Sequence, residues 1–185
     1  LFLDQRANRR FIRSLPPGRL LNTFAYTCSF SVAAASAGWT TFSIDLSKKS
    51  VDRGRFNFGL NGLPQEGHTF LADDVLEVLP RLQRRGETFD AIILDPPTFS
   101  RGNRGRRFQV VENMPDLIRM AIELARPGAR ILISTNCTAL AVRDLEWMGR
   151  DTLKGLRRSG EFMRTEPLPD LEAEFGAKTV WLMLR

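Results

Sequence analysis

The stretch FDAIILDPPTF, at residues 89–99, decides the fold of this chain. Its first part is an apolar run of the length typical of a buried strand. Pro96 and Pro97 cannot continue a central ladder, because proline lacks the N–H donor and fixes φ, so the chain must leave the sheet just after Asp95. The stretch therefore predicts a carboxylate at the carboxyl end of a buried strand. In an open α/β sheet, that edge is where ligands bind.

Strands and helices alternate along the rest of the chain. Apolar runs predict strands at residues 19–24, 40–45, 67–71 and 129–135, with weaker ones near Phe162 and at 178–184. Helical spacing and caps predict helices at residues 3–15, 29–37, 47–62, 73–86, 115–126 and 141–159, and a long polar loop reaches residue 113. This alternation predicts an α/β fold with a mostly parallel, doubly wound sheet, helices on both faces and an antiparallel strand near the C-terminus.

Length and composition limit the classes of protein. A chain of 185 residues with 43% hydrophobic content forms one domain with an adequate core. The 27 Lys and Arg against 21 acidic residues favour a polyanionic partner, with nucleic acid the first candidate. Two distant cysteines without a secretory signal favour the cytoplasm, and no apolar run approaches the roughly 20 residues of a membrane span. Since the chain opens at Leu1 on a segment that looks structured, we expect it to be part of a longer protein.

Three acidic positions close strands or open the helices that follow them. They are Asp45, Asp73 or Asp74, and Asp95, and the carboxyl ends of parallel strands meet at one edge. Asp45 lies about 20 residues after the first strand–helix turn, where nucleotide-type cofactors have their ribose hydroxyls accepted. Each acid alone is better explained as a helix cap, but the three together favour a cofactor site.

The first turn, at residues 24–29, contains no glycine. Dinucleotide sites need glycines there to bring the backbone against a pyrophosphate, so an NAD-type dehydrogenase is disfavoured. S-adenosylmethionine has a nucleoside but no phosphates and does not impose that demand.

Several motifs together resemble the catalytic domain of bacterial large-subunit ribosomal RNA methyltransferases. They are LFLDQR at residues 1–6, NTFAYT at 22–27, IDLS at 44–47, AD at 72–73, DPPTFS at 95–100 and WL at 181–182. The resemblance covers residues 1–185 and implies a class I methyltransferase fold in which residues 1–18 cover the cofactor site. The full-length relatives carry an amino-terminal RNA-binding domain. The cofactor implied is S-adenosylmethionine, with ribosomal RNA as the partner and no metal.

The resemblance implies a role for each residue that faces the cofactor. Asp45 would hold the ribose, Asp73 would face the adenine amino group, and Tyr26 and Thr27 would pass beneath the methionine moiety. Asp95 would border the reactive end of the cofactor.

The resemblance also includes a segment that folds over the cofactor and one departure from the family pattern. Gln5 and Arg6 match the covering segment. Cys28 stands where the family usually has glycine, which implies a less close approach of the backbone to the cofactor at that point.

Asp95, Pro96 and Pro97 match the family's catalytic motif, where the target base would enter beside the methyl group. The Asp95 carboxylate can accept from a base amino group or, when protonated, donate to a ring nitrogen. Phe99 offers either a stacking face to a flipped base or a core contact under the loop.

Cys137 bears on the choice between two branches of the family, of which one makes 5-methylcytosine and the other makes 7-methylguanine. Cytosine C5 needs a thiolate to add at C6 before it can take a methyl group, whereas guanine N7 has a free lone pair. Cys137 therefore favours cytosine as the substrate, with Cys137 as nucleophile. A small buried side chain is the structural alternative for this cysteine, and the DPPTFS motif and Asn136 are closer to the guanine branch.

The loop after the catalytic motif is rich in arginine. Arg101, Arg104, Arg106 and Arg107 are placed to contact RNA phosphates, unless they form only a solvated loop. The sequence thus predicts a ribosomal RNA methyltransferase. An inactive cofactor-binding module and a small-molecule methyltransferase remain as alternatives, the latter disfavoured by the arginines.

Overall fold

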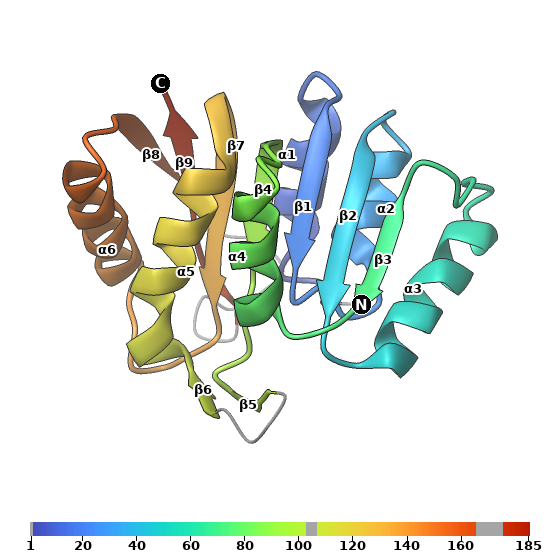
Figure 1. Ribbon diagram of the computed structural model, residues 1–185, viewed down its shortest axis with the longest axis horizontal. Helices are drawn as coiled ribbons and strands as arrows, with labels where there is room; N and C mark the ends of the chain where they lie inside the picture. The colour runs from blue at the N-terminus through green and yellow to red at the C-terminus, as the bar shows by residue number, and fades with distance from the viewer. Residues whose placement is uncertain (1, 103–106, 166–175) are drawn as a thin grey trace.

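The computed structural model describes residues 2–102, 107–165 and 176–185. Its core is a seven-stranded sheet in the order β3-β2-β1-β4-β7-β9-β8 (Figure 1). The strands are β1 (Arg19–Thr23), β2 (Thr40–Asp45), β3 (Thr69–Ala72), β4 (Phe89–Leu94), β7 (Ala125–Thr135), β8 (Gly160–Arg164) and β9 (Lys178–Leu184). The strands from β3 to β7 in this order pair in parallel, whereas β9 is antiparallel to both of its neighbours. The predicted doubly wound sheet with an antiparallel strand near the C-terminus is confirmed.

Helices cover both faces of the sheet. They are α1 (Arg6–Ser14), α2 (Ser29–Ala35), α3 (Lys48–Leu60), α4 (Val75–Arg84), α5 (Val110–Leu124) and α6 (Val142–Gly155). In Figure 1, α4, α5 and α6 lie in front of the sheet, and α1 and α2 lie behind it. Within the described residues, no helix is both long enough and apolar enough to cross a bilayer.

The apolar run of β4 is buried on both sides, as expected for a central parallel strand. Ile92 and Leu94 belong to the apolar cluster under α4, α5 and α6. Ala91 and Ile93 belong to the cluster under α1 and α2. Because both faces of β4 are fixed by packing, the position of Asp95 directly after this strand is fixed as well.

Several boundaries differ from the sequence prediction: β7 begins at Ala125 and not at Ala129, and two further differences lie between β4 and α5. Helix α5 begins at Val110, not in the turn of Pro115, and the Asn113 side chain accepts a hydrogen bond from the backbone N–H of Gln109 at its start. The predicted loop before it contains an antiparallel hairpin of β5 (Phe99–Arg101) and β6 (Arg107–Gln109). Proline is tolerated early in a helix at several positions, so Pro115 alone could not locate the first turn.

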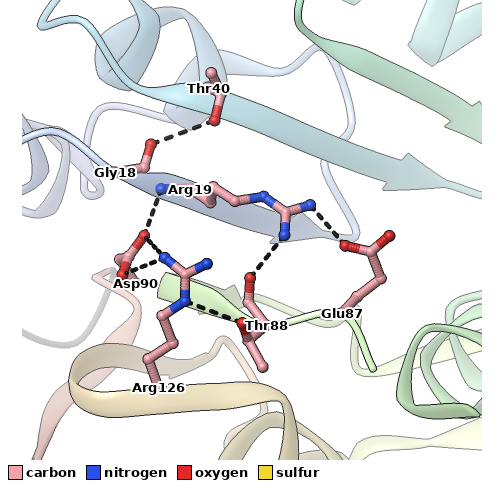
Figure 2. A network of polar contacts seen from close by, with 7 residues as sticks. All are labelled: Gly18, Arg19, Thr40, Glu87, Thr88, Asp90 and Arg126. Carbon is pink, nitrogen blue, oxygen red and sulfur yellow. Dashed lines mark hydrogen bonds and ion pairs between the residues drawn. The ribbon is translucent and has the colours of Figure 1, made fainter. Parts of the chain in front are cut away.

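A polar network joins the starts of β1, β4 and β7 at the amino edge of the sheet (Figure 2). The Asp90 carboxylate accepts from the backbone N–H of Arg19 at 2.8 Å and from the Arg126 guanidinium at 3.0 Å. The Arg19 guanidinium in turn donates to Glu87 at 2.8 Å. Gly18 lies so close that an added Cβ would stand 2.6 Å from an Asp90 oxygen. This network holds the edge opposite the carboxyl ends of the parallel strands.

Candidate active site

A cavity of about 540 Å³ lies at the carboxyl ends of the parallel strands, between the loops that follow them and the segment before α1. Its volume is that of a small-molecule site. Nine of the residues singled out in the sequence line it: Gln5, Tyr26, Thr27, Asp45, Asp74, Asp95, Pro96, Pro97 and Asn136. Others from the same predictions are not among its lining residues: Arg6, Asp73, Phe99, Arg101, Arg107 and Cys137.

Asp45, at the end of β2, joins two loops of the cavity wall. Its carboxylate accepts from the backbone N–H of Tyr26 at 2.7 Å and from that of Ser47 at 2.9 Å. Each carboxylate oxygen has a second lone pair, so Asp45 can still accept from two hydroxyl groups of a ligand. This geometry suits a ribose diol.

The loop after β1 achieves its shape without glycine. Phe24, Tyr26 and Cys28 have φ values of 51°, 46° and 60°, in the left-handed region that residues other than glycine rarely adopt. Alternate residues in strained backbone are typical of functional loops that the surrounding structure holds in place.

Cys28 is compatible with this loop because a glycine lies opposite its side chain. The side chain is fully buried and packs against Gly54 of α3, where an added Cβ would lie 2.4 Å from the Cys28 sulfur. It is not among the residues that line the cavity. Burial raises the pKa of the Cys28 thiol to about 11, so the group is protonated and unreactive at neutral pH.

The two adjacent acids after β3 have different environments. Asp74 caps α4 by accepting from the backbone N–H of Leu76 at 2.9 Å, and it lines the cavity together with Val75 and Leu76. Asp73 forms an ion pair with Arg81 at 2.6 Å and is not part of the cavity wall. Of the two acids that the sequence offered at this edge, Asp74 lines the cavity, and the role of Asp73 toward the adenine stays a prediction.

Asp95 is a half-buried carboxyl on the cavity wall. Burial raises its pKa to about 6, a hydrogen bond with Ser134 opposes that rise, and the nearby charge of Asp4 adds to it. The Gln5 amide also donates to Asp95 at 3.4 Å. A carboxyl with this pKa can accept a proton or release it near neutral pH, which suits acid–base work on a polar ligand.

Cys137 follows β7 on the same edge but belongs to the core. It is 6% exposed and belongs to the same apolar cluster as Leu140 and Leu145. Its backbone carbonyl accepts from the Lys178 ammonium at 3.1 Å. The preceding residue, Asn136, lines the cavity instead.

The β5–β6 hairpin lies beyond the ends of the strands, at the lower edge of Figure 1. Phe99 is 51% exposed on it, and the exposed Arg101 and Arg107 are paired in register. Arg104 and Arg106 lie outside the described residues. Phe108, which the sequence analysis did not single out, faces inward and lines the cavity, its ring 5.5 Å from that of Phe24.

Among the described residues, no group of three His, Cys, Asp or Glu side chains could hold a metal ion. The polar side chains that line the cavity carry carboxylates, amides and hydroxyls. They suit an organic ligand with hydroxyl and amino groups.

Comparison with known proteins agrees with this chemistry. A family profile for S-adenosylmethionine-dependent methyltransferases matches residues 1–181. A protein of Serratia proteamaculans named "Ribosomal RNA large subunit methyltransferase I" is 37% identical over 146 residues. The match includes 78% of this chain and 36% of that protein, so the chain spans little more than a third of the curated relatives it matches.

Solved structures show the same architecture. The methyltransferase SMU.776, crystallised with SAH, superposes with a TM-score of 0.85 at 27% identity, covering 100% of this chain and 50% of that one. An S-adenosylmethionine-dependent methyltransferase from Agrobacterium tumefaciens has a TM-score of 0.81 at 24% identity, covering 100% of this chain and 62% of that one. The second likeness supports the fold alone.

Proposed function

Since the chain belongs to the family of S-adenosylmethionine-dependent methyltransferases, we propose that its cavity binds S-adenosylmethionine and that the protein methylates a base of large-subunit ribosomal RNA. The observation that carries the proposal is one cavity bordered by Asp45, Asp74 and Asp95, each at the end of a different strand. The name of the Serratia relative supports ribosomal RNA as the substrate.

The described residues fit this cofactor. Asp45 accepts the ribose hydroxyls, while Asp74 and the adjoining turn border the adenine. The backbone at Tyr26 and Thr27 passes under the methionine part. S-adenosylmethionine supplies a methyl group on a positively charged sulfur, which makes that carbon open to attack by a nucleophile. Carboxylates on the cavity wall stabilise a cation of this kind.

Asp95 positions the acceptor base. The two prolines that follow it have fixed φ values, so the carboxyl is presented at a defined place on the cavity wall. It accepts from a base amino group in its charged form or donates to a ring nitrogen when protonated. Holding the base against the methyl carbon supplies much of the catalysis, because orientation removes an entropic part of the barrier.

The acceptor atom has two candidates. A ring nitrogen such as guanine N7 needs no covalent help, and the burial of Cys137 outside the cavity favours it. Cytosine C5 requires a thiolate. The position of Cys137 directly after the cavity residue Asn136 supports that second candidate, which requires the thiol to leave its apolar surroundings when RNA binds.

The hairpin supplies the surface for RNA outside the cavity. Exposed Arg101 and Arg107 are suited to phosphates, and exposed Phe99 is suited to stacking on an unpaired base. A solvated hairpin without RNA contacts is the alternative, and the salt dependence of RNA binding distinguishes the two.

The cofactor part is tested by calorimetry with SAH. Asp45→Ala should weaken binding by about 1 to 3 kcal/mol, the cost of removing a charged hydrogen-bonding partner. Asp52→Ala is the matched control, because Asp52 pairs with Lys48 on the exposed face of α3. Equal affinities for the two variants would contradict the role of Asp45.

The reaction is tested by incubating the protein with large-subunit ribosomal RNA and S-adenosylmethionine, followed by mass spectrometry of the nucleosides. We expect one methylated base, lost in Asp95→Ala. Cys137→Ala should leave SAH binding intact; loss of 5-methylcytosine in this variant would establish the cytosine mechanism, and full activity would exclude it. SAH binding with no transfer to RNA would contradict the proposed substrate and leave a cofactor-binding module or a small-molecule methyltransferase.

A further inference from the structure

A continuous chain of hydrogen bonds runs from β9 through α1 to Asp95. The Trp181 indole N–H donates to Asn8 Oδ1 at 2.8 Å, and Asn8 Nδ2 donates to Gln5 Oε1 at 2.8 Å. Gln5 Nε2 donates to Ser134 Oγ at 2.8 Å and to Asp95 Oδ2 at 3.4 Å. Ser134 is itself hydrogen-bonded to the Asp95 carboxyl. Trp181, Asn8, Gln5 and Ser134 are each no more than 2% exposed, so water does not replace these bonds.

The Trp181 indole, at the far end of this series of hydrogen bonds, sets the direction of each bond in the series. An indole nitrogen can only donate, so Trp181 requires the oxygen of the Asn8 amide to face it. The Thr165 hydroxyl reinforces this orientation, because it accepts from Thr179 and donates to the same Asn8 oxygen at 3.0 Å. The Asn8 nitrogen must then face Gln5.

The same logic continues toward the cavity. Since Asn8 presents N–H groups, Gln5 must turn its carbonyl toward Asn8 and its own N–H groups toward Ser134 and Asp95. Ser134 accepts from Gln5, so its hydroxyl hydrogen remains for the Asp95 carboxyl. Asp95 thus receives donors, and never a carbonyl, on its inner side.

We propose that Trp181, Asn8, Gln5 and Ser134 form a directional relay of positioning residues, which orients the Asp95 carboxyl and keeps its outward oxygen free to accept from the substrate. The inference rests on the proposed function, in which Asp95 contacts the acceptor base. It also explains why Gln5 and Asn8 are buried on one turn of the chain at the start of α1, although both are polar.

The relay acts against two effects that favour the protonated carboxyl. Burial is the larger one, and the charge of Asp4 in the segment before α1 is the other. Asp4 itself accepts from the backbone N–H groups of Gln5 and Ala177. Donors from Gln5 and Ser134 stabilise the charged form of Asp95, so loss or reversal of the relay must raise the pKa of that carboxyl further.

The test is a titration of Asp95 by NMR, with the aspartate carboxyl carbons labelled with ¹³C and no cofactor or RNA present. Asp95→Asn identifies the resonance. Ser134→Ala and Gln5→Met each remove a donor without adding charge, and each should raise the pKa of Asp95 by about one unit.

The directional part is tested at the far end of the relay. The double variant Trp181→Phe with Thr165→Val removes both donors that hold the Asn8 amide, so the two amides can reverse and the pKa of Asp95 should rise. Trp39→Phe is the matched control: Trp39 is also buried, but its indole nitrogen has no hydrogen-bond partner in the described structure. The same loss of volume should leave Asp95 unchanged.

Two results would overturn the relay. One is an unchanged pKa in both Ser134→Ala and Gln5→Met; the other is a double variant that titrates like Trp39→Phe. A double variant that does not fold leaves the two single variants as the deciding measurement. Because the titration uses neither cofactor nor RNA, a failure of ribosomal RNA methylation would not alter its outcome. In an active enzyme, the acidic limb of the pH–rate profile should move to higher pH in the same variants.

Discussion

Gly54→Ala is expected to disturb the loop after β1, which lines the cavity, through Cys28. The Cβ added at Gly54 would lie 2.4 Å from the Cys28 sulfur and 2.9 Å from the Cys28 Cβ. Both residues are buried, so neither side chain can swing into solvent. Cys28 must therefore shift, and it directly follows Thr27 on the cavity wall.

The size of the effect follows from two opposing contributions. Overpacking a buried site costs about 1 to 3 kcal/mol, while replacing glycine inside a helix gains about 0.5 to 1 kcal/mol. We expect Gly54→Ala to lower the free energy of unfolding by about 1 to 2 kcal/mol in urea denaturation. Gly59→Ala, in the same helix with nothing within 4 Å of an added Cβ, should show only the gain.

A second substitution separates a local clash from a general loss of stability. Cys28→Gly removes the thiol and suits the left-handed backbone at φ 60°. Combined with Gly54→Ala, it should restore both stability and SAH affinity, with a coupling energy above about 1 kcal/mol. The reasoning is refuted if Gly54→Ala is as stable as Gly59→Ala, or if the double variant shows no coupling.

Three further outcomes are expected. Since folding raises the pKa of Asp95 from 3.8 to about 6, the free energy of unfolding should fall as pH rises through this window; Asp95→Asn should abolish that slope and gain up to about 3 kcal/mol at pH 7 in urea denaturation. Gly18→Ala should lower the melting temperature, because its Cβ would displace the Asp90 carboxylate from the amino-edge network; an unchanged value would contradict this. Replacing Arg101 and Arg107 by Ala should make the slope of log affinity for RNA against log salt shallower by up to about 2, and an unaltered slope would place the RNA surface elsewhere.

The order of the elements and the edge of the site could be predicted because both depend on local chemistry. The apolar run of β4 and the prolines after it require a buried strand that ends at Asp95. Asp45 could be placed at this edge of the sheet from its spacing after the first strand–helix turn. Residue types that can cap a helix were less informative about where α4 begins. Asp73 and Asp74 are both suitable caps, and only packing decides which carboxylate caps α4 and which pairs with Arg81.

Pairs distant in sequence could not be predicted in the same way. Cys28 in place of the family's usual glycine implied a less close approach of the backbone to the cofactor, but the space that Cys28 needs is provided by Gly54 on another helix. The sequence around Cys28 does not indicate its contact with Gly54, and the sequence around Gly54 does not indicate it either. The relay from Trp181 to Asp95 is a similar case, since it joins residues from β9, α1 and β7 with a strand end.

The end of β7 shows why the acceptor base is harder to predict than the cofactor. The prediction of the cofactor depended on three acids from separate strands, and either Asp73 or Asp74 keeps a carboxylate at the same edge. The prediction of the acceptor depended on whether Asn136 or Cys137 faces the cavity, and these neighbouring residues carry an amide and a thiol. Asn136 lines the cavity and Cys137 packs with the core. A covalent route would have to exchange these two positions. Trapping of Cys137 by a mechanism-based cytosine analogue in RNA therefore requires a structural change at the end of β7. Methylation of a ring nitrogen requires no such change.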